Sequence, residues 1–444
     1  MKQLFVITFL CLAFLADAQD STLTFREAVK IALDNSINLN QQQNQLYINQ
    51  SQKLQAQSQY LPSVAINGFG QRTDGQQISP LTGQGEDVTS DQFRASINAS
   101  LSLFNGFSRI NSLKQANYTF EAQNNAVERA RQDVIFNVAN QYLQVLLDEE
   151  LLRIANENLE SQRKLHDQIN GFYEAGMRPV TDLYTQEAQV KNFEVQVIRS
   201  ENTLRNDKSI LAQTLQLDPV MEFVLERPEW DVKADEFNQI NLDDLYAIAS
   251  QNRSDLKQAE FTKRSTKYGY KSTLSGYMPS LDLFAGYGSQ YFSRGEDGED
   301  SFKTQFVDLN PALSYGFQFS IPLFDRFVTK TNRVTNRIRY ENAEYNYQNL
   351  EKTVKIDVQR AYQNYLGAIK NYTFSQSQYK AAELSYRTQK ESFDLDVANQ
   401  LELAQANQLY VQAQASLVQA ELSLMFQSIL LDYNLGTLKF EDIR

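Results

Sequence analysis

Residues 93–103 read FRASINASLSL, in which apolar or small side chains alternate with polar ones. Residues 313–323, LSYGFQFSIPL, alternate in the same way but with larger aromatic side chains. A period of two places successive side chains on opposite faces of a β-strand. About eleven residues is the length of a tilted strand that spans a membrane, with one face toward lipid and one toward a water-filled lumen. Both stretches therefore predict membrane strands.

Weaker alternation over Val64–Gln71 and Leu281–Phe292 predicts a partner strand for each. The two hairpins would cover about residues 61–104 and 279–323, closed by outward-facing polar loops over 73–91 and 293–308. Apolar and polar residues also alternate in the half-buried sheet of a soluble protein. The strand sequences by themselves therefore leave this alternative open. Aromatic residues at the strand ends favour the membrane, because lipid-spanning strands carry aromatic girdles. These aromatic residues are Phe104, Phe107, Tyr291, Phe292, Phe324 and Phe327.

Four strands are too few to close a barrel. An open edge in hydrocarbon would leave backbone N–H and C=O groups without partners. The sequence therefore predicts an oligomer, and three copies would supply twelve strands.

The chain also predicts an internal duplication. Tyr60-Leu-Pro-Ser63 recurs 217 positions later as Tyr277-Met-Pro-Ser280, and Leu103-Phe104 recurs 220 positions later as Leu323-Phe324. A constant register over so long a stretch indicates two copies of one supersecondary unit. The repeats would cover residues 19–218 and 242–444, joined by a linker over 219–241 that shows neither helical nor strand periodicity.

Long helices are expected after each hairpin. Residues 107–170 and 368–435 contain no Gly or Pro, and apolar residues recur there at spacings of three and four. The helices would extend over about 107–215 and 327–435, coiled around others to bury their narrow apolar stripes. The acidic run Asp148-Glu-Glu150 is expected to be a solvated helix face.

The first eighteen residues predict a signal peptide. Lys2 precedes an apolar run over residues 4–15, and Ala16-Asp-Ala18 is the small-x-small pattern of a signal peptidase site. Export from the cytoplasm is therefore expected.

The composition excludes several functional classes. With 42 basic against 54 acidic residues the net charge is -12, which argues against a nucleic-acid partner. His166 is the one histidine, and Cys11 is the one cysteine. The chain therefore lacks the several His and Cys residues of a Cys/His metal site, and a catalytic triad would depend on a single histidine. A Walker-type Gly-Lys-Ser/Thr loop is absent. No enzyme activity, cofactor or metal site is expected.

The predicted order of elements resembles that of the TolC family of outer-membrane efflux ducts. A helix, a strand hairpin, a long helix, a turn and a return helix follow the signal peptide, and this series occurs twice. The local matches are Tyr173-Glu-Ala-Gly176 followed by Thr181-Asp-Leu183, and the closing Leu435-Gly-Thr-Leu438. The resemblance implies an α+β membrane protein: a homotrimer with a twelve-stranded barrel in the outer membrane, to which each protomer gives four strands, and a periplasmic coiled-coil barrel of helices. It also implies a periplasmic adaptor protein and an inner-membrane pump as partners, besides outer-membrane lipid.

The resemblance points to a gate at the periplasmic tip, where Asp182 and Glu402 occupy equivalent places in the two repeats. Three copies of each would form a negative constriction. Gln405, one turn after Glu402, replaces a second acid of some family members, and Ala398 stands where an arginine that links protomers is found in others. The tip turns themselves would contain Tyr173, Gly176, Thr181, Leu183, Phe393 and Leu403.

A simpler interpretation of the two acids remains open: each complements the dipole of a helix start, with Thr181 as the N-cap in the first case.

The function expected from the sequence is a passive exit duct of a tripartite efflux or type I secretion system. The alternative is a structural or adhesive surface protein, with a coiled-coil stalk on a barrel anchor. The duplication favours the duct, because two helix–hairpin–helix units build a continuous tube. The cargo and the identity of the adaptor are not encoded in any motif of the chain.

Overall fold

A computed structural model describes residues 22–78, 83–218, 223–228, 241–294, 299–395 and 397–442. The predicted signal peptide and most of the predicted linker lie outside the described residues. The chain forms two compact units. The sheet unit comprises Gln42–Val127 and Ser254–Lys352, and the helical unit comprises the residues up to Gln41, Glu128–Arg253 and those from Thr353 onward.

None of the described helices is long and apolar enough to cross a membrane.

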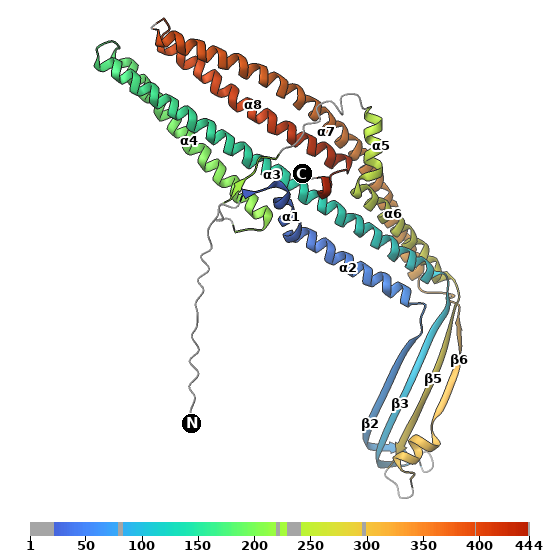
Figure 1. Cartoon of the computed structure of the whole chain (residues 1–444). Helices are drawn as coiled ribbons and strands as arrows, with labels where there is room; N and C mark the ends of the chain where they lie inside the picture. Colours follow the sequence, from blue (N-terminus) through green and yellow to red (C-terminus); the bar gives the residue numbers. More distant parts are fainter. Residues whose placement is uncertain are drawn as a thin grey trace, which may run out of the picture. The chain divides into compact units, whose positions relative to one another are not determined.

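The sheet unit is built around four antiparallel strands, which lie side by side in the order β2, β3, β5, β6 (Figure 1). They are β2 (Ser63–Ile78), β3 (Gly85–Asn105), β5 (Ser280–Ser293) and β6 (Ala312–Ser320). All four join helices at one end of the sheet, and the hairpin connections lie at the other end. A short π-helix, η2 (Thr304–Leu309), stands between β5 and β6.

The two faces of this sheet differ in chemistry. Pairing aligns Ile66, Ile97, Tyr287 and Leu313 in one row across all four strands. The neighbouring row is Ala65, Asn98, Gly286 and Ser314. The apolar row is open to its surroundings, since Ile66 is 81% and Leu313 is 67% exposed. The alternation predicted for the strands is therefore confirmed, with the apolar face uncovered.

The expectation of a long loop over residues 73–91 is wrong. β2 continues to Ile78 and β3 already begins at Gly85, with Asp74 opposite Thr89. Arg72 and Asp91 form an ion pair of 2.6 Å across the two strands. Polar side chains occupy both faces of this extension. The sequence there does not alternate between apolar and polar residues, and alternation is the pattern that predicts a strand.

Helices of the sheet unit pack through polar and aromatic contacts. They are the main part of α2 (Ile37–Ser58), the start of α3 (Ser108–Glu174), α6 (Ser254–Ser272) with the 3-10 turn η1 (Thr273–Tyr277), and the start of α7 (Val328–Asp394). The Thr119 and Ser265 hydroxyls lie 2.7 Å apart, and the Tyr118 ring stacks on that of Tyr268 at 5.5 Å.

The helical unit contains the long return helices. Its elements are α1 (Phe25–Asn35), the rest of α3, α4 (Val180–Leu215), α5 (Leu242–Asn252), the rest of α7, α8 (Gln400–Leu435) and the 3-10 turn η3 (Phe440–Asp442). In Figure 1, α3 pairs with α4 and α7 pairs with α8. α3 and α7 have 67 residues each, and α4 and α8 have 36 each. The two long helices are thus equal in length, and so are the two return helices.

The core of the helical unit centres on Tyr142, which is fully buried. Its hydroxyl lies 2.8 Å from the Leu23 carbonyl oxygen and 2.6 Å from that of Glu226. Leu23 ends β1 (Thr22–Leu23) and Glu226 directly follows β4 (Val224–Leu225), and these two short strands pair in parallel. A single α3 side chain thus fixes two segments that are distant in sequence.

Candidate functional site at the helical turns

The first turn joins α3 to α4. Gly176 has φ +71, a left-handed conformation that glycine adopts without strain, and Tyr173 beside it is 41% exposed. Thr181 is not the N-cap, because α4 begins one residue earlier, at Val180. Pro179 holds the cap position and makes no side-chain cap hydrogen bond. Pro179 is extended, with φ -74 and ψ 154, as an N-cap residue is, but its side chain has no oxygen that could cap the helix.

The second turn joins α7 to α8 and is capped from both sides. Asn399 Oδ1 accepts a hydrogen bond of 2.9 Å from the Glu402 backbone N–H. Glu402 Oε2 accepts one of 3.2 Å from the Asn399 N–H and another of 3.2 Å from Gln389 Nε2. This capping box satisfies two N–H groups that the helix leaves unpaired. Asp396, the counterpart of Gly176, lies outside the described residues.

The two turns pack against each other. Phe393 and Leu403 are 2% and 3% exposed, and they form one cluster with Ile169 and Ala398, against which Leu183 also packs. The Arg178 guanidinium lies 4.6 Å from the centre of the Phe393 ring. Gln400 Nε2 donates a 3.1 Å hydrogen bond to the Asp182 carbonyl oxygen. The beginnings of α4 and α8 are therefore held side by side within one chain.

The two candidate gate acids have different surroundings. The Asp182 carboxylate lies 3.5 Å from the Arg178 guanidinium, and its side chain is 25% exposed. Glu402 and Gln405 are both exposed. Glu402 has a structural role in the capping box, which supports the interpretation that this acid complements a helix start. Its side chain is also exposed, so its charge is accessible from solvent.

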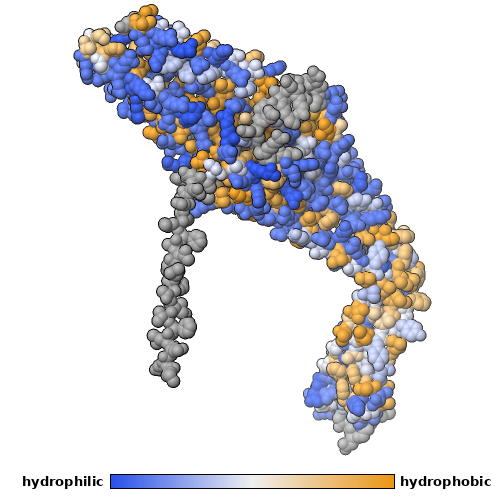
Figure 2. Space-filling view, in the orientation of Figure 1, coloured by the Kyte–Doolittle hydropathy of each residue, from blue (hydrophilic) through white to orange (hydrophobic). Residues whose placement is uncertain are grey.

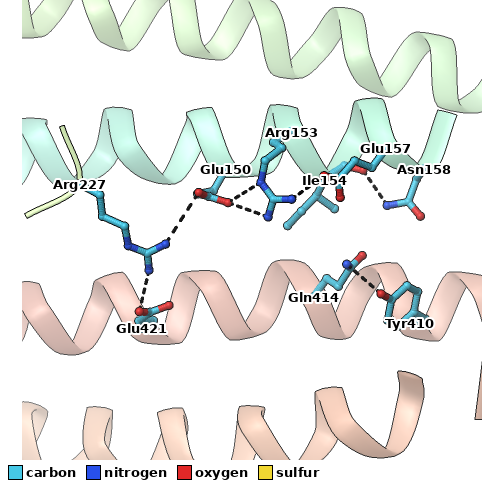
Figure 3. A network of polar contacts seen from close by, with 9 residues as sticks. All are labelled: Glu150, Arg153, Ile154, Glu157, Asn158, Arg227, Tyr410, Gln414 and Glu421. Carbon is cyan, nitrogen blue, oxygen red and sulfur yellow. Dashed lines mark hydrogen bonds and ion pairs between the residues drawn. The ribbon is translucent and has the colours of Figure 1, made fainter. Parts of the chain in front are cut away.

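The acidic run Asp148–Glu150 is not a solvated face. Glu149 pairs with Lys208 at 2.8 Å, and Glu150 accepts from Arg153 and faces Arg227 at 3.8 Å. Figure 3 shows Arg227 between Glu150 on α3 and Glu421 on α8, to which it is bonded at 2.7 Å. Successive helix residues point about 100° apart, so three adjacent acids meet three different environments.

Asp148 itself is only 4% exposed. Gln144 Nε2 donates to its Oδ1 at 3.3 Å, whereas no described residue donates to its Oδ2. Burial and the neighbouring Asp207 carboxyl raise the pKa of Asp148 to about 7.

Arg109 is a buried base whose surroundings the sequence did not reveal. It is 8% exposed, its guanidinium donates to the Ser102 carbonyl oxygen, and it lies 4.8 Å from the centre of the Tyr60 ring. It lines a polar hollow of about 500 Å³ in the sheet unit, together with Ser63, Ser100 and Asp282. Only contacts between segments far apart in sequence define this hollow, so no local pattern could have indicated it.

The described residues include no cluster of three or more His, Cys, Asp or Glu that could hold a metal ion.

The sequence of this chain is similar to those of outer membrane proteins. A family model described as "Outer membrane efflux protein" matches residues 28–215 and 245–437. The outer membrane protein TolC of Vibrio cholerae serotype O1 is 22% identical over 358 residues, 80% of this chain and 79% of that protein.

Solved structures share the fold. The Campylobacter jejuni outer membrane channel CmeC superposes with a TM-score of 0.80 at 18% identity, over 93% of this chain and 85% of its own. CusC superposes with a TM-score of 0.81 at 15% identity, over 94% and 92% of the two chains. The likeness therefore extends over both the strands and the long helices.

Proposed function

This chain belongs to the outer membrane efflux protein family and is an outer-membrane exit duct, and from that premise we propose how its residues build and gate the duct. The family consists of channel proteins rather than enzymes. The finer features, namely the trimer, the closed barrel, the tandem repeats and the gate, follow as parts of this proposal.

The sheet carries the proposal, because it has two chemically different faces and two unpaired edges. Among the described strands, β2 and β6 each pair on one side only. Unpaired backbone groups cannot face hydrocarbon, so each edge needs a partner. β2 and β6 run in opposite directions, so β6 of one copy can pair with β2 of the next in the same antiparallel pattern. Three copies close a barrel of twelve strands, with the apolar rows toward lipid.

The helices continue this duct into the periplasm. The two proposed repeats, residues 19–218 and 242–444, each contribute one 67-residue and one 36-residue helix. These helices carry narrow apolar stripes that long coiled helices bury against neighbours. We infer a coiled-coil tunnel made of the six helix pairs of a trimer.

The duct is passive and acts with partners. The sequence has no Walker-type loop that could bind a nucleotide. An inner-membrane pump and a periplasmic adaptor would supply the energy and the cargo, and the turns of the helical unit are where the adaptor would dock.

The gate would form where the first turns of α4 and α8 meet. Threefold symmetry brings three copies of Asp182 and Glu402 around one axis, with Gln405 one turn further along. The hydrogen bond from Gln400 to the Asp182 carbonyl supports this assignment, because it keeps the two acidic helix starts adjacent in each copy. Clustered carboxylates favour cations and bind multivalent ones.

The test is conductance. Purified protein inserted into a planar lipid bilayer is expected to give discrete single-channel currents, and unboiled protein is expected to migrate as a trimer on gels. A boiled aliquot is the matched control and should show neither property. Folded trimers that carry no current would contradict the duct and favour the structural or adhesive stalk.

A further inference from the structure

The two ends of the sheet carry opposite charge. Residues 42–62, 105–120, 261–281 and 321–340, which include the four connections between strands and helices, contain twelve Lys and Arg and one acid, Asp325. At the hairpin end, the described residues within 72–92 and 294–308 include seven Asp and Glu and three Lys and Arg. The chain as a whole has a charge of -12. The positive end is therefore a local feature that the overall composition hides.

Exposed aromatic rings surround the positive end. We call Phe104, Phe107, Phe324 and Phe327 the aromatic collar. Its rings meet edge to face in pairs, Phe104 with Phe107 at 5.3 Å and Phe324 with Phe327 at 5.7 Å. Phe324 is 74% and Phe327 is 62% exposed. Figure 2 shows hydrophobic residues gathered where the strands meet the helices.

The backbone turns that place the collar are strained in both halves of the chain. Phe107 and Phe327 have φ +65 and φ +63, a left-handed conformation that costs a bulky residue about 1–3 kcal/mol. Asn105 and Asp325 hold the turns by accepting hydrogen bonds from the backbone N–H groups of Arg109 and Thr329 at 3.2 and 2.7 Å. The fold thus maintains two exposed phenylalanines at a conformational cost.

Basic side chains lie beside one ring of the aromatic collar and beside two tyrosine rings of α6. Lys330 Nζ lies 5.7 Å from the centre of the Phe327 ring, and the Arg333 guanidinium lies 5.0 Å from that of Tyr270. Lys114 and Lys271 flank the Tyr268 ring at 5.3 and 5.2 Å. We call the following residues the basic collar: Lys114, Lys267, Lys271, Arg326, Lys330 and Arg333.

Among the residues that the structure describes, no member of the basic collar forms an ion pair with a carboxylate. By contrast, the next bases along α6 and α7 are paired, as Arg264 is with Glu260 and Arg337 with Glu341. The bases of the basic collar are therefore available to an external anion.

We propose that the basic collar binds the anionic headgroups of phospholipids in the membrane leaflet that faces the periplasm. Exposed aromatic rings next to unpaired Lys and Arg are typical of a membrane–water interface, where the rings lie among headgroups and the cations reach phosphate. Each base near an anionic lipid surface contributes about 1 kcal/mol. The inference rests on the proposed function only in requiring that the strands span the membrane.

Lipid selectivity tests the proposal. Full-length protein in detergent is incubated with equal amounts of phosphatidylglycerol and phosphatidylcholine, separated from free lipid, and its bound lipid is quantified. The wild type should retain more phosphatidylglycerol. A variant with Lys267→Gln, Lys271→Gln, Lys330→Gln and Arg333→Gln should lose this preference about tenfold or more. High salt should weaken the wild-type preference, because ions screen exposed charges.

A matched control removes the same charges elsewhere. Lys370, Lys380, Arg387 and Lys390 are exposed residues of α7 in the helical unit, and their change to Gln should leave the preference intact. Equal preference in the wild type and the collar variant, or equal loss in the control, would overturn the proposal. So would a collar variant that keeps its lipid preference but changes its anion selectivity, because its bases would then line the duct.

Conductance separates this result from the proposed function. Currents of the collar variant in neutral phosphatidylcholine should match those of the wild type. Wild-type protein that selects phosphatidylglycerol but carries no current would refute the duct and leave the lipid site standing.

Discussion

Asp148 shows how a single buried acid couples stability to pH. Its pKa of about 7 lies above the ordinary value of 3.8. Between about pH 4 and pH 7 the folded protein therefore holds a proton that the unfolded chain has released. The free energy of unfolding falls as the pH rises through this window and becomes level above it.

Asp148→Asn should remove this dependence. The amide cannot ionise, so at pH 8 the variant should be more stable than the wild type by about 2 kcal/mol. Thermal unfolding followed by helical circular dichroism at pH 5 and pH 8 measures the effect. Asp167→Asn is the control, since that α3 side chain is 84% exposed. A wild-type melting temperature that does not change with pH would show that Asp148 ionises normally.

At the residue scale, sequence reasoning succeeded where neighbours in sequence determine the environment. Gly176 is in a tight turn as expected, because a left-handed residue at a helix end is a local requirement. It failed at Asp148 and Arg109, whose surroundings come from α4 and from the strands. It also failed at Thr181, because the N-cap is Pro179 and α4 begins at Val180.

At the scale of an element, Glu402 combines two roles at the start of α8, which separate substitutions can distinguish. Glu402→Gln keeps a residue that can complete the capping box but removes the charge. It should weaken the block of single-channel current by multivalent cations. Glu402→Ala should do the same and also lose about 1 kcal/mol of helix-start stability. Both effects are read from bilayer currents and thermal unfolding.

Glu391→Gln, near the end of α7, is the matched control for lost charge and should leave the cation block unchanged. If the block in Glu402→Gln equals that of the wild type, Glu402 is a cap and not part of a gate.

Strands and helices differed in how well their bounds could be predicted. The expected strands were correct where apolar and polar residues alternate, as in the row of Ile97. Their extensions over 73–78 and 85–91 were missed, because backbone pairing there continues between polar residues. The helices were recognisable from long stretches without Gly or Pro.

At the scale of the whole molecule, the open sheet predicts contacts between copies. Described residues of the mature chain include no cysteine, since Cys11 lies in the predicted signal peptide. A cysteine at Ile66 in β2 should therefore crosslink to one at Leu313, Tyr315 or Phe317 in β6 of the next copy. These side chains share the apolar face.

Non-reducing gels should show covalent dimers and trimers for at least one of the three pairs. Ile66→Cys combined with Ser314→Cys is the control, because Ser314 belongs to the polar face. Crosslinking of none of the apolar pairs, or only of the control pair, would contradict closure through β2 and β6.

Pairing of β3 with β5 has a consequence for biogenesis. Leu101 lies opposite Leu283, so the centre of the sheet joins residues that are synthesised far apart. The hairpin β2–β3 is local and can form early, but its partner emerges only after α3 and α4 are complete. Closing so long a loop carries an entropic cost before the contact is gained. Until then an apolar hairpin with an unpaired edge has no neighbour, and such a species is prone to aggregate.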